Sequence, residues 1–255
     1  MTIAIIPARM ASTRFPGKPL AKIHGIPMIG HCYFRSKMSD SVDEVFIATC
    51  DEKIRQYAVS IGAPCIMTAN THERASDRIA EAMLKIENKT NVEHNIVVLV
   101  QGDEPMLHPK MIDVTVSALE IDPNINVSNG YAKIATEEEF NDPNEVKVVI
   151  DSNSNAMYFS REPIPSTKKW DGKVPMYKQV CIIPFKRDYL LEFNRLPQSD
   201  LEKIESVDML RVLETGSKVK MVPMKTETFS VDTQEDLQKV IQAMANDKLI
   251  SRYRN

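Results

Sequence analysis

The chain has 255 residues, of which 43% are hydrophobic and 26% charged, and its formal net charge at pH 7 is −3. This composition is typical of a globular protein with a sizeable core, and the slightly acidic balance argues against general binding to nucleic acid. No apolar run approaches the roughly 18–20 residues needed to span a bilayer, so we expect no membrane association. The four cysteines form no CxxC pair and the first residues lack a secretion signal, which predicts a cytoplasmic protein with reduced thiols.

Short apolar runs rich in β-branched residues predict three buried strands in the first half, at residues 2–6, 44–49 and 95–100. They do not alternate with polar residues, which is typical of strands that are covered on both faces in a parallel sheet. Residues with helical spacing separate the strands, around 29–33 and 79–86. Strands and helices therefore alternate, and this order predicts a doubly wound α/β fold with a mostly parallel sheet.

The pattern changes beyond about residue 122, where a mixed or antiparallel β extension is expected. Its strands are predicted at residues 127–134, 146–150 and 178–183. The polar stretch 166–175, which contains Trp170, predicts an exposed loop. We find no repeat or linker, and we therefore expect one domain over residues 1–255, with the extension inside residues 122–215.

Near the end of the chain, residues 233–236 form a capping box, the side-chain pattern that starts many helices. Apolar residues follow it at helical spacing, from Leu237 to Met244. This segment predicts an amphipathic helix whose apolar face packs against the rest of the fold.

A basic and stiff loop follows the first predicted strand. It carries Arg9, Arg14 and Lys18, which can neutralise several phosphate charges, and three prolines that reduce the entropy lost on binding. Ligands of open α/β sheets bind just beyond the carboxyl ends of the strands, which is where this loop lies. The loop contains neither GxGxxG nor GxxxxGK[ST]. It is a candidate phosphate site of another kind, and a solvated basic turn is the alternative.

Two acidic segments are candidate metal sites. In QGDEP, Asp103 follows the third buried strand, and a carboxylate placed beside an anionic ligand is best explained by a cation between them. In VDTQEDL, Asp232 is the second candidate. Mg²⁺ is typically held by one or two carboxylates together with substrate phosphates, which both aspartates would suit. The sequence does not bring them together, and an acidic turn and a helix-dipole contact are the alternatives.

The order of residues in the basic loop, P-A-R-x-x-S-T-R-x-P-G-K-P-L, resembles the opening motif of the 3-deoxy-manno-octulosonate (Kdo) cytidylyltransferase family. Five further segments are similar to motifs of that family, in the same order along nearly the whole chain: QGDEP, FNDPNEVKVVID, AMYFSREPIP, LEKIESVDMLRVLETG and VDTQEDL. The resemblance implies a fold like that of the nucleotide-diphospho-sugar transferases. It implies coupling of CTP to an acidic sugar with release of pyrophosphate, Mg²⁺ as cofactor, a homodimer, and a role in lipopolysaccharide biosynthesis.

The resemblance also implies roles for individual residues. The catalytic set is Arg9, Arg14, Lys18 and Asp103, and the metal would lie on Asp103 and Asp232. The nucleotide-binding set is Pro7, Ala8, Arg9, Ser12, Arg14, Lys18, Arg78 and Gln101. The acceptor-binding set is Arg161, Gln179, Ile183, Glu205, Asp208 and Met209. With Arg211, which also matches the family, Arg161 and Glu205 predict a polar, anionic acceptor.

The chain departs from the family where the family handles its sugar acid. Gln179 replaces a histidine, Ile183 a tyrosine and Met209 a glutamine, and residues 74–78 read RASDR where the family has SGTDR. Each polar group left unpaired by these changes would cost about 1–3 kcal/mol, which predicts an acceptor other than plain Kdo. The alternative is that Kdo remains the acceptor and Gln179 replaces one hydrogen bond. The candidates are an amino-substituted Kdo, a nine-carbon ulosonate and a phosphonate. A catalytically silent nucleotide-binding paralogue is the alternative from another class.

Overall fold

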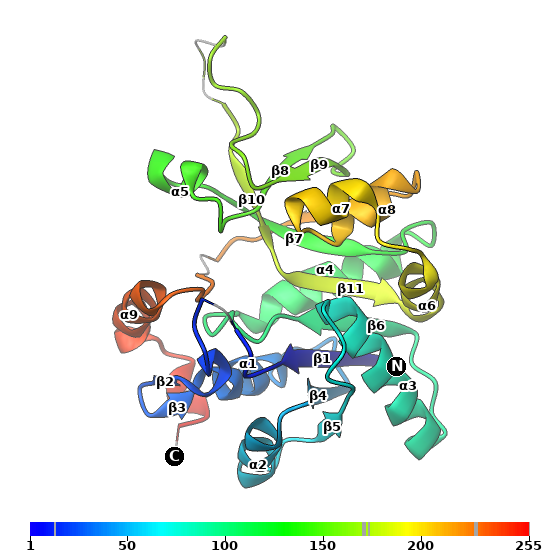
Figure 1. Ribbon diagram of the computed structural model, residues 1–255, viewed down its shortest axis with the longest axis vertical. Helices are drawn as coiled ribbons and strands as arrows, with labels where there is room; N and C mark the ends of the chain where they lie inside the picture. Colours follow the sequence, from blue (N-terminus) through cyan, green and yellow to red (C-terminus); the bar gives the residue numbers. More distant parts are fainter. Residues whose placement is uncertain (13, 170–171, 173, 227–228, 255) are drawn as a thin grey trace. The chain divides into compact units, whose positions relative to one another are not determined.

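A computed structural model describes residues 1–12, 14–169, 172, 174–226 and 229–254. It divides into two compact units, Met1–Asp113 with Thr228–Asn255 (unit 1) and Val114–Glu227 (unit 2). Figure 1 shows their helices and strands in sequence colours. Trp170 lies outside the described residues. Within these residues, no helix has both the length and the apolar character needed to cross a membrane.

Unit 1 is built on a parallel sheet, as the sequence predicts. Its strands lie in the order β6-β1-β4-β5, and each neighbouring pair is parallel. The central strand β1 (Thr2–Ala8) is buried along its whole length because it has a strand on either side and helices of unit 1 pack against it. The other three strands are β4 (Glu44–Thr49), β5 (Cys65–Met67) and β6 (Ile96–Val100).

Helices and short turns connect these strands. The helices are α1 (Met28–Ser36), α2 (Glu52–Ser60), α3 (Ala75–Thr90) and α9 (Gln234–Ala243), and α4 (Pro109–Ile121) crosses the boundary of the units. The 3-10 turns are η1 (Lys18–Leu20), η2 (Met244–Asn246) and η3 (Ile250–Arg252), and β2 (Lys22–Ile23) pairs with β3 (Ile26–Pro27). The predicted capping box of α9 is confirmed, because the Thr233 hydroxyl accepts from the Asp236 N–H.

Unit 2 contains the predicted mixed β extension. Its sheet has the order β12-β7-β10-β8-β9, in which only the β12–β7 pair is parallel. These five strands are β7 (Ser128–Lys133), β8 (Lys147–Ile150), β9 (Ala156–Ser160), β10 (Tyr177–Val180) and β12 (Lys220–Pro223), and the strand β11 (Ile182–Lys186) is not part of this order. The helices are α5 (Glu137–Asn141), α6 (Arg187–Arg195), α7 (Asp200–Glu205) and α8 (Met209–Glu214). The strand expected over 178–183 divides at Cys181 into β10 and β11.

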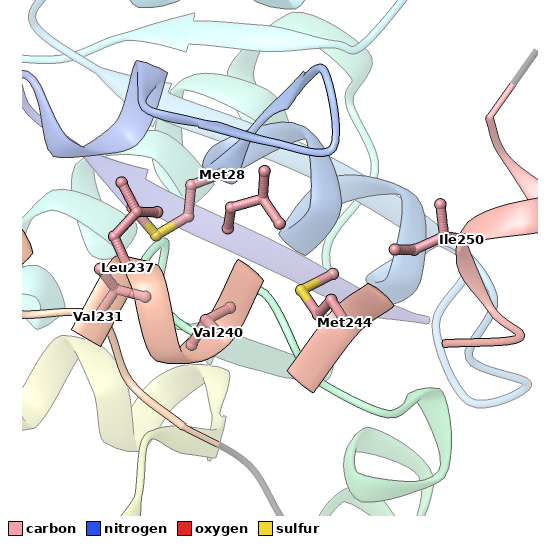
Figure 2. Packing of buried hydrophobic residues seen from close by; sticks show 7 residues of the cluster. Met28, Val231, Leu237, Val240, Met244 and Ile250 are labelled. Carbon is pink, nitrogen blue, oxygen red and sulfur yellow. The ribbon is translucent and has the colours of Figure 1, made fainter. Parts of the chain in front are cut away.

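A hydrophobic cluster in unit 1 fixes α9 and the C-terminal segment (Figure 2). Its buried members are Ile23, Met28, Val231, Leu237, Val240, Met244 and Ile250. Phe15 of the basic loop and Met106 of the loop after β6 pack against them. Since the segments that carry Arg14, Asp103 and Asp232 all contribute to this cluster, one packing arrangement sets the positions of all three.

A chain of hydrogen bonds ties the C-terminus to α1. The buried Arg35 donates from Nε to the Tyr253 hydroxyl over 3.0 Å, and that hydroxyl lies 2.8 Å from His31 Nδ1. His31 Nε2 lies 2.9 Å from the Ile23 carbonyl, which can only accept. Nε2 of His31 therefore carries a proton, and in the neutral ring Nδ1 accepts from the Tyr253 hydroxyl. Burial lowers the pKa of His31 to about 4, in keeping with that arrangement.

We expect Leu237→Ala to lower the free energy of unfolding by about 2–5 kcal/mol, because it opens a cavity in the cluster of Figure 2. Urea unfolding followed by circular dichroism measures the change. Gln238→Ala on the exposed face of the same helix is the matched control and should stay within about 0.5 kcal/mol of the wild type. Equal losses for the two variants would contradict the assignment of α9 to this core.

The state of His31 makes stability depend on pH. Its pKa in the folded chain, about 4, lies below the ordinary value of 6.5, so the unfolded chain takes up the proton first as the pH falls. The free energy of unfolding should be fully retained above about pH 6.5 and decrease toward pH 4. His31→Gln should show a smaller decrease over that range in urea titrations. Parallel pH profiles for the wild type and the variant would rule out this role.

Candidate functional site

The ammonium of Lys18 lies between two carboxylates in unit 1. Lys18 Nζ is 2.8 Å from Asp103 Oδ2 and 3.1 Å from Asp232 Oδ1, and Arg14 Nη2 is 3.0 Å from the same oxygen of Asp232. The three central side chains are 13%, 22% and 17% exposed, so the ion pairs are partly shielded from water. The structure thus brings together two predicted metal ligands and two predicted phosphate ligands, which the sequence alone leaves far apart.

The loop after β6 presents Asp103 because Gly102 allows a close approach. A Cβ at Gly102 would lie 3.0 Å from the Pro7 carbonyl oxygen and 3.1 Å from Ile29 Cδ1, so a side chain would push the loop off the end of β1. The Val231 N–H donates to the Asp103 carbonyl over 3.0 Å. That bond holds the segment before α9 against the loop and places the two aspartates side by side.

Lys18 keeps its positive charge in this setting. Burial lowers the pKa of Lys18, but the charges and hydrogen bonds of Asp103 and Asp232 raise it by more. The net shift of the pKa is therefore upward. Gly17, with a φ of 77°, makes the left-handed turn that starts η1 and aims Lys18 at the carboxylates. An ammonium that stays charged between two carboxylates shows that this position accommodates a cation.

Asp51, which was not predicted from the sequence, orders the basic loop. Its Oδ2 accepts the Met10 N–H over 2.8 Å, at the start of the loop. Within the loop, the Ser12 hydroxyl accepts the Phe15 N–H over 3.4 Å, while Arg9 is exposed. Asp51 follows β4, next to β1 in the sheet, so the parallel order predicted from the sequence could have pointed to it.

The remaining residues of the predicted nucleotide-binding set lie around the same end of the sheet. Pro7 and Ala8 are buried at the end of β1, and Gln101 is half-buried directly before Gly102. Arg78 is 3% exposed, and its Nη1 donates to Thr68 Oγ1 over 2.5 Å and to the Ala69 carbonyl over 3.1 Å. The structure therefore gives Arg78 a positioning role, since its guanidinium holds the segment after β5.

In unit 2, Arg161 and Glu205 of the predicted acceptor set lie together. Glu205 accepts from the Ser160 hydroxyl over 2.8 Å, from the Tyr158 hydroxyl over 3.2 Å and from the Arg161 N–H over 2.8 Å. Arg161 Nε donates to the Glu205 carbonyl over 2.7 Å. These bonds fix the end of α7 against β9.

Gln179 has a fixed amide orientation. Asn129 donates from Nδ2 to the Gly130 and Val180 carbonyls over 3.0 and 2.7 Å, so its Oδ1 must serve as an acceptor. Gln179 Nε2 donates to that oxygen over 2.6 Å. The carbonyl oxygen of Gln179 therefore points away from Asn129, and it can only accept a hydrogen bond.

Three other residues of the expected acceptor region are buried. Ile183 in β11 is 3% exposed and Met209, the first residue of α8 after Asp208, is 0% exposed. Arg211 is 3% exposed and donates to both carboxylate oxygens of the buried Glu202, over 2.7 and 2.6 Å. Our expectation that Arg211 helps to recognise an anionic acceptor is wrong, because its guanidinium is part of the core of unit 2.

A magnesium ion fits the pair of carboxylates. Within the described part of the chain, no group of three or more His, Cys, Asp or Glu side chains could hold a metal ion. The two carboxylates that now contact the Lys18 ammonium would nevertheless suit Mg²⁺. This ion commonly takes one or two carboxylates and completes its shell with phosphate oxygens and water. A magnesium ion held by these two carboxylates would need an anionic co-ligand to complete its shell.

A family model described as "Cytidylyltransferase" matches residues 3–222. The 3-deoxy-manno-octulosonate cytidylyltransferase of Geobacter metallireducens is 40% identical, covering 95% of this chain and 97% of its own. The protein of the same name from Pelobacter propionicus is 42% identical, and the match covers 92% of this chain and 94% of the relative.

Solved structures agree. A CMP:2-keto-3-deoxy-manno-octonic acid synthetase in complex with CTP has a TM-score of 0.87 at 37% identity, covering 96% of this chain and 99% of its own. A cytidylyltransferase from Leptospira borgpetersenii, at 17% identity and a TM-score of 0.62, covers 96% of this chain and 86% of its own, and shows a likeness of fold alone.

We expect Asp51→Ala to loosen the basic loop without unfolding the chain. Loss of the charged acceptor for the Met10 N–H should speed amide exchange in the loop by about tenfold or more, since such bonds are worth about 1.5–3 kcal/mol. Hydrogen-exchange mass spectrometry measures this for peptides that cover residues 9–17. Asp51→Asn keeps an acceptor oxygen and should show a smaller effect. Unchanged exchange in Asp51→Ala would remove Asp51 from this role.

Proposed function

The chain belongs to the cytidylyltransferase family, and from this premise we propose that it couples CTP to Kdo or a closely related acid, giving a CMP-sugar and pyrophosphate. The observation that carries the proposal is the cluster of Arg14, Lys18, Asp103 and Asp232 in unit 1. It combines cationic groups for a triphosphate with carboxylates for a cation. The 40–42% identity to Kdo cytidylyltransferases along almost the full chain supports the reaction class.

In this reaction an acceptor hydroxyl attacks the α-phosphorus of CTP, and the bond to the departing pyrophosphate breaks. Arg9, Arg14 and Lys18 bind the triphosphate and stabilise the charge that develops on the leaving group. Asp103 and Asp232 would hold Mg²⁺, which when bound supplies Lewis-acid polarisation of a phosphoryl oxygen. The main chain at Pro7 and Ala8 and the side chain of Gln101 would contact the base, and Arg78 supports the segment after β5.

The acceptor-binding role of unit 2 is part of the proposal. In its fixed orientation Gln179 keeps its carbonyl oxygen as an acceptor and the second N–H of Nε2 as a donor, so it can pair with a hydroxyl on the acid. Arg161 and Glu205 shape the neighbouring backbone. The family resemblance supports a homodimer, a cytoplasmic location and a product destined for lipopolysaccharide. The silent paralogue is disfavoured because the charged cluster of unit 1 is complete.

Release of pyrophosphate from CTP and Mg²⁺ tests the proposal. We expect release with Kdo, or with an amino-substituted Kdo, a nine-carbon ulosonate or a small phosphonate in its place. Asp103→Asn should lower kcat by about a hundredfold or more, because it removes half of the carboxylate pair that holds the cation.

Glu235→Gln, in the exposed first turn of α9, is the matched control and should retain the wild-type rate. Binding of CTP without turnover on any of these acids would favour the silent paralogue. A fully active Asp103→Asn variant would refute the assigned site.

A further inference from the structure

The position of Lys18 suggests more than phosphate binding. Its ammonium lies where the two carboxylates converge, which is the place a divalent cation would take. We propose that Lys18 is an internal counter-ion, which holds Asp103 and Asp232 together before the metal binds and moves to the triphosphate when the metal enters. This inference rests on the proposed function, because it needs a divalent cation and a phosphate ligand at the same site.

The charges of Asp103 and Asp232 require a cation between them. Two carboxylates that face one position repel each other, and each raises the cost of ionising the other unless a cation lies between them. The Lys18 ammonium donates to both carboxylates, which are its only hydrogen-bond acceptors within the described residues. With 13% of its side chain exposed, Lys18 has little access to water as an alternative partner. The carboxylate pair is therefore kept ready for a cation.

Lys18 is more mobile than the two aspartates that it contacts. The aspartates are held through their backbones, Asp103 by the bond from Val231 and Asp232 by the bond of its N–H to Asp236 Oδ2 over 3.1 Å. Lys18 reaches them through a flexible four-carbon stem. When a divalent cation enters, the lysine is thus the group that can leave while the carboxylates stay. Its ammonium then needs a new anionic partner, and the phosphates of the nucleotide supply one.

The consequence is a coupling between metal and nucleotide. Without nucleotide, a metal ion must displace the ammonium and leave it without a partner, so binding is weak. With nucleotide bound, the displaced ammonium gains a phosphate contact, so the metal binds more tightly. By linkage, bound metal strengthens nucleotide binding by the same factor. Part of this gain comes from direct contact between metal and phosphate. The part that depends on Lys18 is what the proposal adds.

Arg14 provides a matched comparison, because it is also cationic, pairs with Asp232 over 3.0 Å and is 48% exposed. If Lys18 acted only by long-range electrostatic repulsion of the metal ion, removing either Lys18 or Arg14 would strengthen metal binding to a similar degree. If Lys18 occupies the metal position, its removal should have the larger effect.

The test is titration of the full chain with Mn²⁺, followed by electron paramagnetic resonance, with and without a CTP analogue that has a methylene bridge between the α- and β-phosphates. Without the analogue, Lys18→Met should bind Mn²⁺ about tenfold more tightly than the wild type, which corresponds to about 1.4 kcal/mol. Arg14→Met should change the affinity for Mn²⁺ less than threefold, and Lys22→Met, at an exposed position, should leave it unchanged.

The CTP analogue should strengthen Mn²⁺ binding less in Lys18→Met than in the wild type.

Lys18→Gln is a second variant, in case the methionine disturbs folding, and circular dichroism checks both. The inference is overturned if Lys18→Met and Lys18→Gln bind Mn²⁺ no more tightly than the wild type or Arg14→Met, or if no variant binds Mn²⁺ at all. Pyrophosphate release separates the two proposals. Turnover by the wild type together with unchanged Mn²⁺ affinity in the Lys18 variants would remove the counter-ion role and leave the proposed function intact.

Discussion

The contact on which the site depends is the double ion pair of Lys18 with Asp103 and Asp232. Its partners lie 85 and 214 residues from Lys18 along the chain, so it exists only if three separate segments are placed accurately. Each carboxylate alone is an ordinary acidic side chain at the end of a strand or before a helix. Together with the ammonium, they form a partly shielded cluster that can exchange one cation for another.

The rest of unit 1 serves to hold those segments. Gly102 lets the loop after β6 lie against the end of β1, and the bond from Val231 fastens the segment before α9 to it. The hydrophobic cluster of Figure 2 packs beneath both, and the neutral His31 with Tyr253 ties down the end of the chain. Catalysis by positioning and charge neutralisation needs rigidity of this kind, because the rate depends on how accurately the reacting groups are held.

The sequence predicted the parts that depend on local patterns. Buried strands, their parallel order and the capping box of α9 follow from short-range periodicity and side-chain chemistry, and the structure confirms them. The pairing of Arg211 with Glu202 was missed because an arginine at a motif position looks the same in the sequence whether it faces a ligand or a buried carboxylate. Arg78 and Asp51 illustrate the same limit, since their partners are set by packing between elements.

A crystal structure with Mn²⁺ and the methylene-bridged CTP analogue would show whether the metal takes the position of the Lys18 ammonium, because anomalous scattering locates the metal without assumptions about the side chains. We predict a metal peak in contact with Asp103 and Asp232, and Lys18 Nζ within hydrogen-bond distance of a phosphate oxygen. A metal bound elsewhere, with Lys18 still between the two carboxylates, would contradict it.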